Sequence, residues 1–155
     1  GTGINSGSKV VLAAYGEKLR ELATEVPAEL KELQGFVNPQ LCMPGVVALQ
    51  ANAFTTYENA AKEIAALNAQ LEPQLQTANN KLQTVQIIVI ADDSSFTAAT
   101  LNNYLWVTYT RCNPSHDMHG IGAFTEHKHW GCRGPLVIDA RIKPHHAPAL
   151  VKDPA

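Results

Sequence analysis

Apolar side chains recur at helical spacing in three parts of this chain. Residues 9–34 place one apolar stripe opposite a charged face, which predicts a helix that Pro27 interrupts before a short second helix stopped by Gly35. In the second part of the chain, a helix is expected to begin at Thr55 or Thr56 and to break or kink at Pro73.

The third segment, residues 97–110, mixes strand-favouring and helical features. Its β-branched residues favour a strand, whereas Leu101, Leu105 and Thr108 fit one helical face. Its length and the preceding Asp92, Asp93, Ser94 and Ser95, which can cap a helix, favour a helix.

Four shorter apolar runs predict strands, at residues 44–51, 85–91, 118–124 and 136–140. The run at 85–91 is continuously apolar, which is typical of a strand buried on both faces of a parallel sheet. Strands alternating with helices require crossover connections. The sequence therefore predicts an α/β fold, a three-layer α/β/α sandwich with a mainly parallel sheet.

The length and composition of the chain predict a single domain. The chain has 155 residues and a net charge of −2, with no basic stripe, which argues against nucleic acid as a partner. We expect a flexible tail or a fragment boundary at 1–8, an α/β domain at 9–144 and an extended Pro-rich tail at 145–155. No membrane span or secretory signal is expected, and the three cysteines favour the cytoplasm.

Several side chains could carry chemistry. Asp92 and Asp93 follow the clearest strand, where they could bind Mg²⁺ or act as an acid and base, although we favour helix capping. Arg111 could complete a helix dipole, pair with Asp117 or bind a substrate carboxylate or phosphate. Cys112 beside it could have a lowered pKa and act as a nucleophile if a base such as His116 lies nearby, but a small buried thiol is more common.

All six histidines lie after residue 115. Zinc accepts His and Cys in such clusters, but the spacing matches no known finger or protease pattern. The alternative is a polar loop whose histidines hydrogen-bond to backbone or across an interface. The candidate metal ligands are His116, His119, His127, His129 and Cys132.

The order of five short motifs resembles the carboxyl-terminal domain of the UbiD-like (de)carboxylases. The motifs are MPGVVALQA (43–51), TYENAAKEIA (56–65), IIVIADD (87–93), NNYLWVTYTRCNP (102–114) and VIDARIKP (137–144). The chain departs from the family pattern at Glu58-Asn59, where Gly-Gln is usual, and at Asn113, where an acidic residue is usual. A third departure is the loop from His116 to Gly134, which is unusually rich in His. These departures favour the anaerobic aromatic branch, such as phenylphosphate carboxylase-type subunits.

The resemblance implies a lyase that interconverts an aromatic or unsaturated acid with its decarboxylated product and CO2. Prenylated FMN, a divalent metal, a monovalent cation and the catalytic set would lie in an upstream domain, so no catalytic residue is carried over to this chain. The carboxyl-terminal domain would supply oligomer contacts and part of the substrate pocket. By position, the pocket-lining candidates are Trp106, Tyr109, Arg111 and Phe124.

Three functions are therefore open. The first is an oligomerisation and pocket-lining domain of such an enzyme, inert alone and partnered by its upstream domain, by further copies in a homo-oligomer or by other carboxylase subunits. The second is a stand-alone metal-binding protein that uses the His/Cys loop at 116–132. The third is a small regulatory subunit of a carboxylase complex.

Overall fold

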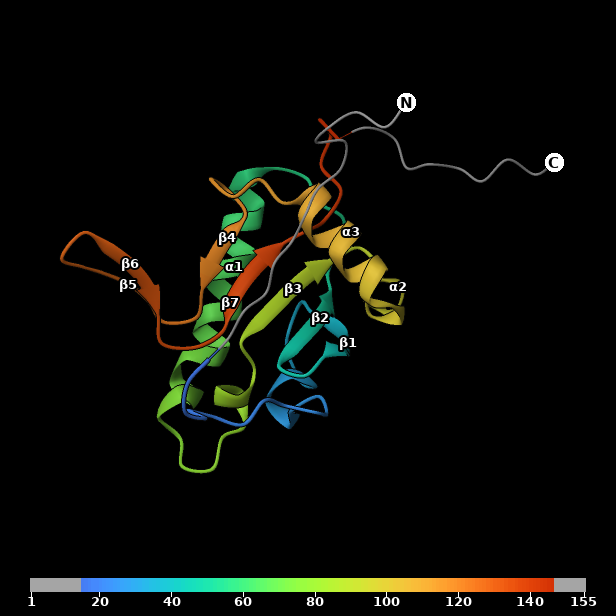
Figure 1. The fold of residues 1–155 in the computed structure, drawn as a ribbon. Coiled ribbons are helices and arrows are strands. Elements are labelled where there is room, and N and C mark those ends of the chain that lie inside the picture. Colours follow the sequence, from blue (N-terminus) through green and yellow to red (C-terminus); the bar gives the residue numbers. More distant parts are fainter. Residues whose placement is uncertain (1–14, 147–155) are drawn as a thin grey trace, which may run out of the picture.

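A mixed five-stranded sheet forms the centre of the computed structural model, which describes residues 15–146 (Figure 1). The strand order is β1-β2-β3-β7-β4. The bounds are β1 (Val37–Met43), β2 (Val46–Gln50), β3 (Ile87–Ala91), β7 (Leu136–Asp139) and β4 (Met118–Gly120). Two further strands, β5 (Ala123–Glu126) and β6 (His129–Cys132), form a separate hairpin.

The expectation of a mainly parallel sheet needs correction. The three central strands β2, β3 and β7 run parallel, but β1 pairs antiparallel with β2 and β4 pairs antiparallel with β7. The first departure has a local cause, because Pro44 and Gly45 link β1 directly to β2 and such a tight turn can join only antiparallel neighbours. Gly45 has φ +76°, which favours glycine at this turn.

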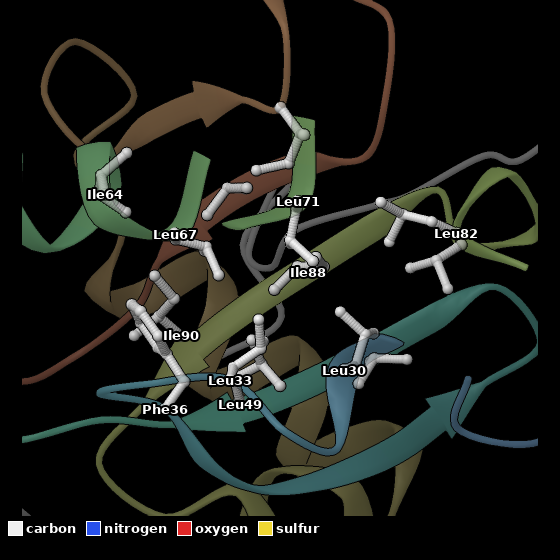
Figure 2. Close-up of a cluster of buried hydrophobic side chains, with 14 of the residues drawn as sticks. Leu30, Leu33, Phe36, Leu49, Ile64, Leu67, Leu71, Leu82, Ile88 and Ile90 are labelled. Atoms are coloured by element: carbon white, nitrogen blue, oxygen red, sulfur yellow. The ribbon is translucent and has the colours of Figure 1, made fainter. Parts of the chain in front are cut away.

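Helices lie against both faces of the sheet. The α-helices are α1 (Tyr57–Leu71), α2 (Ser94–Ala99) and α3 (Leu101–Arg111), and the 3₁₀ turns are η1 (Ala28–Leu30), η2 (Glu72–Gln76) and η3 (Leu82–Thr84). On one face, Leu67 and Leu71 of α1 pack over Ile88 and Ile90 of β3 (Figure 2). On the other face, Tyr104 and Val107 of α3 pack against Val89 and Ala91.

The predicted helix at 9–34 is wrong for its described part. Residues 9–14 lie outside the described range, and residues 15–34 contain only the short turn η1. The backbone of Ala23 instead bridges two other segments, donating to Thr84 O at 2.9 Å and accepting from Gly45 N at 2.8 Å. These long-range bonds hold the segment in an irregular path, so tertiary contacts override its helical pattern.

Two predicted elements are each divided in two. The segment at 97–110 forms parts of α2 and α3, which meet at Thr100 because its extended backbone ends one helix while its side chain accepts from Asn103 N and caps the next. The predicted strand at 118–124 is interrupted at Gly122, whose φ is +62°, and contributes to β4 and β5. The strands at 44–51, 85–91 and 136–140 are confirmed as β2, β3 and β7.

The predicted tails fall mostly beyond the described residues. The tail at 1–8 lies wholly outside them, and of the tail at 145–155 only His145 and His146 lie inside.

Within residues 15–146, the helices are too short or too polar for any of them to cross a membrane.

Truncating Leu67 should test the packing of α1 on the sheet. Leu67 is fully buried, so Leu67→Ala removes apolar contacts and leaves a cavity. We expect a loss of about 2–5 kcal/mol in the free energy of unfolding, measured with urea. Leu101→Ala is the control, since Leu101 is 56% exposed; equal losses for the two variants would contradict the packing described.

Candidate functional site

The carboxyl ends of the parallel strands meet a cluster of buried charges. Asp139 ends β7, and Arg141 and Lys143 follow it at two-residue intervals. With Asp117, these side chains are the buried charged groups of the described chain, each 1% exposed. Ligands in open α/β sheets bind at this edge, so it is the first place to look for a site.

Arg141 ties β7 to the two segments beside it. Its Nε and Nη2 bond both carboxylate oxygens of Asp139, at 3.0 Å and 2.7 Å. Its Nη1 donates to Glu63 Oε2 of α1 at 2.6 Å and to Asn52 O, just after β2, at 2.9 Å. Burial alone would lower the pKa of the guanidinium, but the hydrogen bonds and charge of Asp139, and then those of Glu63, outweigh it and raise the pKa.

Lys143 joins the loop before β4 to the end of α3. Its Nζ lies 3.1 Å from Asp117 Oδ2 and donates to Asp139 O at 2.9 Å and Arg111 O at 3.2 Å. Asp117 Oδ2 also accepts from Asn113 N at 2.6 Å. The ring of Phe54 lies 5.4 Å from the Lys143 ammonium and 5.7 Å from the Arg141 guanidinium, within the range of cation–π attraction.

The two aspartates after β3 have different roles. Asp93 caps α2, because its carboxylate accepts from Phe96 N at 2.9 Å, which confirms the capping role favoured from the sequence. Asp92 does not cap; it accepts from Ile142 N at 2.8 Å and lies 3.3 Å from the Arg111 guanidinium. The suggested Arg111–Asp117 pair is therefore wrong, since Asp117 pairs with Lys143.

Carboxylates of the chain itself neutralise the two buried cations, Arg141 and Lys143. Each cation has a carboxylate partner and further backbone acceptors, which is the condition under which buried charges are tolerated. The cluster therefore links the ends of β2, β7 and α3 to the middle of α1. Such an arrangement stabilises one relative position of these elements, and its charged groups are already occupied with one another.

Sequence reasoning missed this cluster, although a signal was present. Asp139, Arg141 and Lys143 alternate with apolar residues at the end of an apolar strand, so period-two spacing places all three on one side of an extended chain. Opposite charges brought to one buried side would be expected to pair. Glu63 carries no such signal, because its contact with Arg141 spans 78 positions.

The four predicted pocket residues divide between two places. Trp106, Tyr109 and Arg111 share α3, where the Arg111 guanidinium lies 5.1 Å from the Trp106 ring centre. Trp106 and Tyr109 are 42% and 65% exposed. Phe124 lies on β5, where its ring is 5.4 Å from the Arg133 guanidinium, so the structure does not place it with the α3 residues.

The five predicted metal ligands are spread over the loop and its strands. The ring of His116 lies near that of Tyr57, with ring centres 5.0 Å apart and the planes tilted by 41°, and its Nδ1 lies 2.6 Å from Ser115 Oγ. His119 is on β4, while His127 and His129 lie at the turn of the hairpin that ends at Cys132. In the part of the chain from 15 to 146, no three His, Cys, Asp or Glu side chains come together in a way that could hold a metal ion.

The thiols are less acidic than a free cysteine. Burial, followed by the charge of Asp117, raises the pKa of Cys112, so the lowered value considered from its neighbour Arg111 is wrong. Burial raises the pKa of Cys42 to about 11. Both thiols are free, and the thiolate needed for nucleophilic catalysis is disfavoured at each.

Comparison with known proteins finds a decarboxylase subunit among the relatives of this chain. No protein-family model matches the chain. Over 75 residues, which are 48% of this chain and 13% of the relative, it is 33% identical to a 4-hydroxybenzoate decarboxylase subunit of Chlamydia pneumoniae. It is also 24% identical to an uncharacterized protein of Chlamydia caviae over 153 residues, 99% of this chain and 23% of that protein.

A structural likeness is weaker. The vanillic acid decarboxylase of Sedimentibacter hydroxybenzoicus, in its open form, superposes with a TM-score of 0.44 and 15% sequence identity. The superposition covers 82% of this chain and 28% of the decarboxylase chain. The chain spans less than a quarter of the length of the two sequence relatives, and its similarity is to part of each of them.

Removing one charge from the buried cluster should destabilise the fold strongly. Asp139→Asn keeps the shape but leaves Arg141 buried without its main counter-charge, and we expect a loss of about 3–5 kcal/mol in unfolding free energy, measured with urea. Lys81→Met is the control, because the Lys81–Glu25 pair is exposed and should change stability by less than about 1 kcal/mol. Equal effects would contradict a linking role for the cluster.

Alkylation should report the raised thiol pKa values. With a pKa of about 11, Cys42 is almost entirely protonated at pH 8.5, so iodoacetamide should modify it about a hundredfold more slowly than in urea, and its rate should rise with pH up to about 11. Cys112 should also be slower in the folded protein. Peptide mass spectrometry follows each site, and a folded Cys112 that outpaces the unfolded one would restore it as a candidate nucleophile.

Proposed function

We propose that this chain is the carboxyl-terminal part of a UbiD-like (de)carboxylase acting on an aromatic acid. The observation that carries the proposal is the 33% identity to the 4-hydroxybenzoate decarboxylase subunit. The motif order supports it, since the five motif segments contain β2, the start of α1, β3, most of α3 and β7. They therefore fall on the sheet and on helices from both of its faces.

The role proposed for this part is assembly and pocket lining, without chemistry of its own. The buried charges at the carboxyl edge pair with one another, which suits a structural role better than proton transfer. On α3, Trp106 and Tyr109 present aromatic surface that an upstream domain or another subunit could cover. The phenylphosphate carboxylase-type subgroup is part of the proposal and rests on the departures at Glu58-Asn59 and Asn113.

The cofactors belong to the remainder of the proposed enzyme. Prenylated FMN would supply the electron sink for breaking and forming the carboxyl bond. The accompanying divalent metal has no ligand set among residues 15–146, so these residues do not fit it. We therefore assign no cofactor contact and no chemical step to this chain.

An activity comparison tests the proposal. The complete product of the gene, with any subunit that co-purifies, is loaded with prenylated FMN and assayed for CO2 release from 4-hydroxybenzoate and related aromatic acids. The 155-residue chain is treated in the same way. We expect turnover by the complete enzyme and none by the chain alone, because the catalytic groups are expected upstream.

Two variants of the complete enzyme refine the test. Trp106→Ala should raise KM severalfold if this ring lines the substrate pocket, whereas Leu101→Ala on the same helix should leave KM unchanged. Carboxy-lyase turnover by the chain alone, or a complete enzyme inactive on every aromatic acid tried, would contradict the proposed function.

A further inference from the structure

Two of the four arginines of the chain, Arg20 and Arg133, differ from the others in their charge pairing. Arg111 pairs with Asp92, and Arg141 pairs with two carboxylates at the carboxyl edge. In the described part of the chain, neither Arg20 nor Arg133 forms an ion pair with an Asp or Glu side chain. Their positive charges therefore remain available to an anion from outside this part of the chain.

These two arginines line the same cavity, which has a volume of about 510 Å³. Its walls come from three parts of the chain, residues 19–21, 83–86 and 133–134. The last two precede β3 and β7, so the cavity lies at the amino ends of these strands. Figure 1 shows the first described segment (blue) passing below the same ends. Small-molecule sites commonly have volumes of about 300–1,000 Å³, so this cavity is large enough for a ligand.

Backbone hydrogen bonds fix the walls of the cavity relative to one another. Ala23 N, shortly after the first wall, donates to Thr84 O of the second wall at 2.9 Å. Leu136 N, shortly after the third wall, donates to Gln86 O at 2.9 Å. The fold thus forms the cavity without a ligand, as is usual for small-molecule sites.

An uncharged group orients each of the two guanidiniums. Arg20 Nη1 donates to Gln86 Oε1 at 2.7 Å, and Gln86 Nε2 in turn donates to Gln83 O at 3.1 Å. The Arg133 guanidinium lies 5.4 Å from the centre of the Phe124 ring. A side-chain amide and an aromatic ring position these cations without cancelling their charge. Because a guanidinium has five N–H donors, Arg20 keeps further donors for an anion beside its bond to Gln86.

The other side chains of the cavity leave its charge positive. Glu21 is the acidic residue in the walls, and its carboxylate is already paired with Lys18. The neutral polar residues in the walls are Gln83, Thr84 and Gln86. A concave surface with charge of one sign concentrates ions of the opposite sign, so the cavity attracts anions.

We propose that this cavity binds a small organic molecule with two negative charges, carried by phosphate or carboxylate groups. Guanidinium groups bind both kinds of oxyanion through paired N–H donors, and the two arginines match the two charges. Leu19 is 86% exposed beside them and offers apolar contact to the organic part of the ligand. The site goes beyond the carboxy-lyase proposal and does not rest on it, because it lies at the opposite ends of the strands from the paired buried charges.

A bound dianion would join two parts of the chain that are attached loosely to the main sheet. Arg20 belongs to residues 15–27, which form no helix or strand, and Arg133 directly follows the separate β5–β6 hairpin. The unfolded chain does not hold these two arginines together, so the ligand would bind the folded state and stabilise it. We therefore expect the melting temperature to rise with ligand concentration.

Calorimetric titration of the 155-residue chain tests the proposal. The probes are inorganic pyrophosphate, which carries phosphate groups, and isophthalate, which carries two carboxylates on an apolar ring. Sodium chloride keeps the ionic strength constant, because exposed charges are screened by salt. We expect at least one probe to bind at one site per chain and to raise the melting temperature. The probe that binds more tightly identifies the class of the anionic group.

Arg20→Gln and Arg133→Gln each remove one guanidinium from the exposed surface of the cavity. Each should weaken binding of the better probe about tenfold or more, which is the usual effect of losing a hydrogen bond between charged groups. Lys62→Gln is the control, since it makes the same change in net charge at an exposed position of α1 that does not line the cavity. It should leave the affinity unchanged.

Gln86→Glu gives Arg20 the carboxylate partner that it lacks and keeps the shape of the side chain. It should abolish binding without lowering the melting temperature of the free chain. Asn102→Asp, at an exposed position of α3 outside the cavity, adds the same charge and should still bind.

Circular dichroism establishes that each variant folds. Absence of binding by both probes, or affinities lowered equally by the arginine variants and Lys62→Gln, would overturn the proposed site. Binding that Gln86→Glu leaves intact would overturn it as well. The carboxy-lyase proposal stands or falls separately, because the activity comparison tests it without these probes.

Discussion

The paired charges at the carboxyl edge of the sheet are the constraint on which the rest of the fold depends. Arg141 and Lys143 are buried almost completely, and each would be strongly unfavourable there without its carboxylate partner. Their partners come from segments far apart in the chain: Glu63 of α1, Asp117 before β4 and Asp139 of β7. The relative placement of one helix and two strands is therefore set by charge pairing as well as by apolar packing.

The cluster gives the carboxyl edge of the sheet a structural role in place of the ligand site expected there. In an open α/β sheet that edge usually receives a ligand, and a Mg²⁺ or acid–base role for the aspartates after β3 was the alternative to helix capping. Instead, Asp93 caps a helix and Asp92 binds Arg111 and the backbone of Ile142. The chain's remaining distinctive surface lies elsewhere, at the aromatic side of α3 and at the β4 edge with its hairpin. Both surfaces expose apolar side chains, and the assembly role that we propose would cover them.

Local pattern predicted the elements whose cause is local. The apolar run at 85–91 and the cap at Thr56 each determine an element without distant help, and β3 and α1 are where they were expected. The prediction of a helix at 9–34 was wrong because Ala23 hydrogen-bonds to Thr84 and Gly45, and no local sequence pattern indicates these contacts.

Strand β1 was missed because its residues are at most partly buried and include Pro39, so they show little apolar alternation. The candidate site was less predictable still, because Arg141 and Glu63, which come together there, are separated by 78 positions. To predict a pair so far apart in the chain, one must know the order of the strands in the sheet. That order depends on the crossover connections, which a single sequence does not specify in detail.

The most direct measurement is the native mass and composition of the particle that contains this sequence in its source cells. An antibody raised against the α/β domain would capture it, and native mass spectrometry with peptide identification would define its chains. We expect the sequence to occur together with the catalytic portion of a carboxy-lyase, either in one longer polypeptide or in a stable complex. A particle made only of chains the size of this one, without any catalytic portion, would contradict the proposed function.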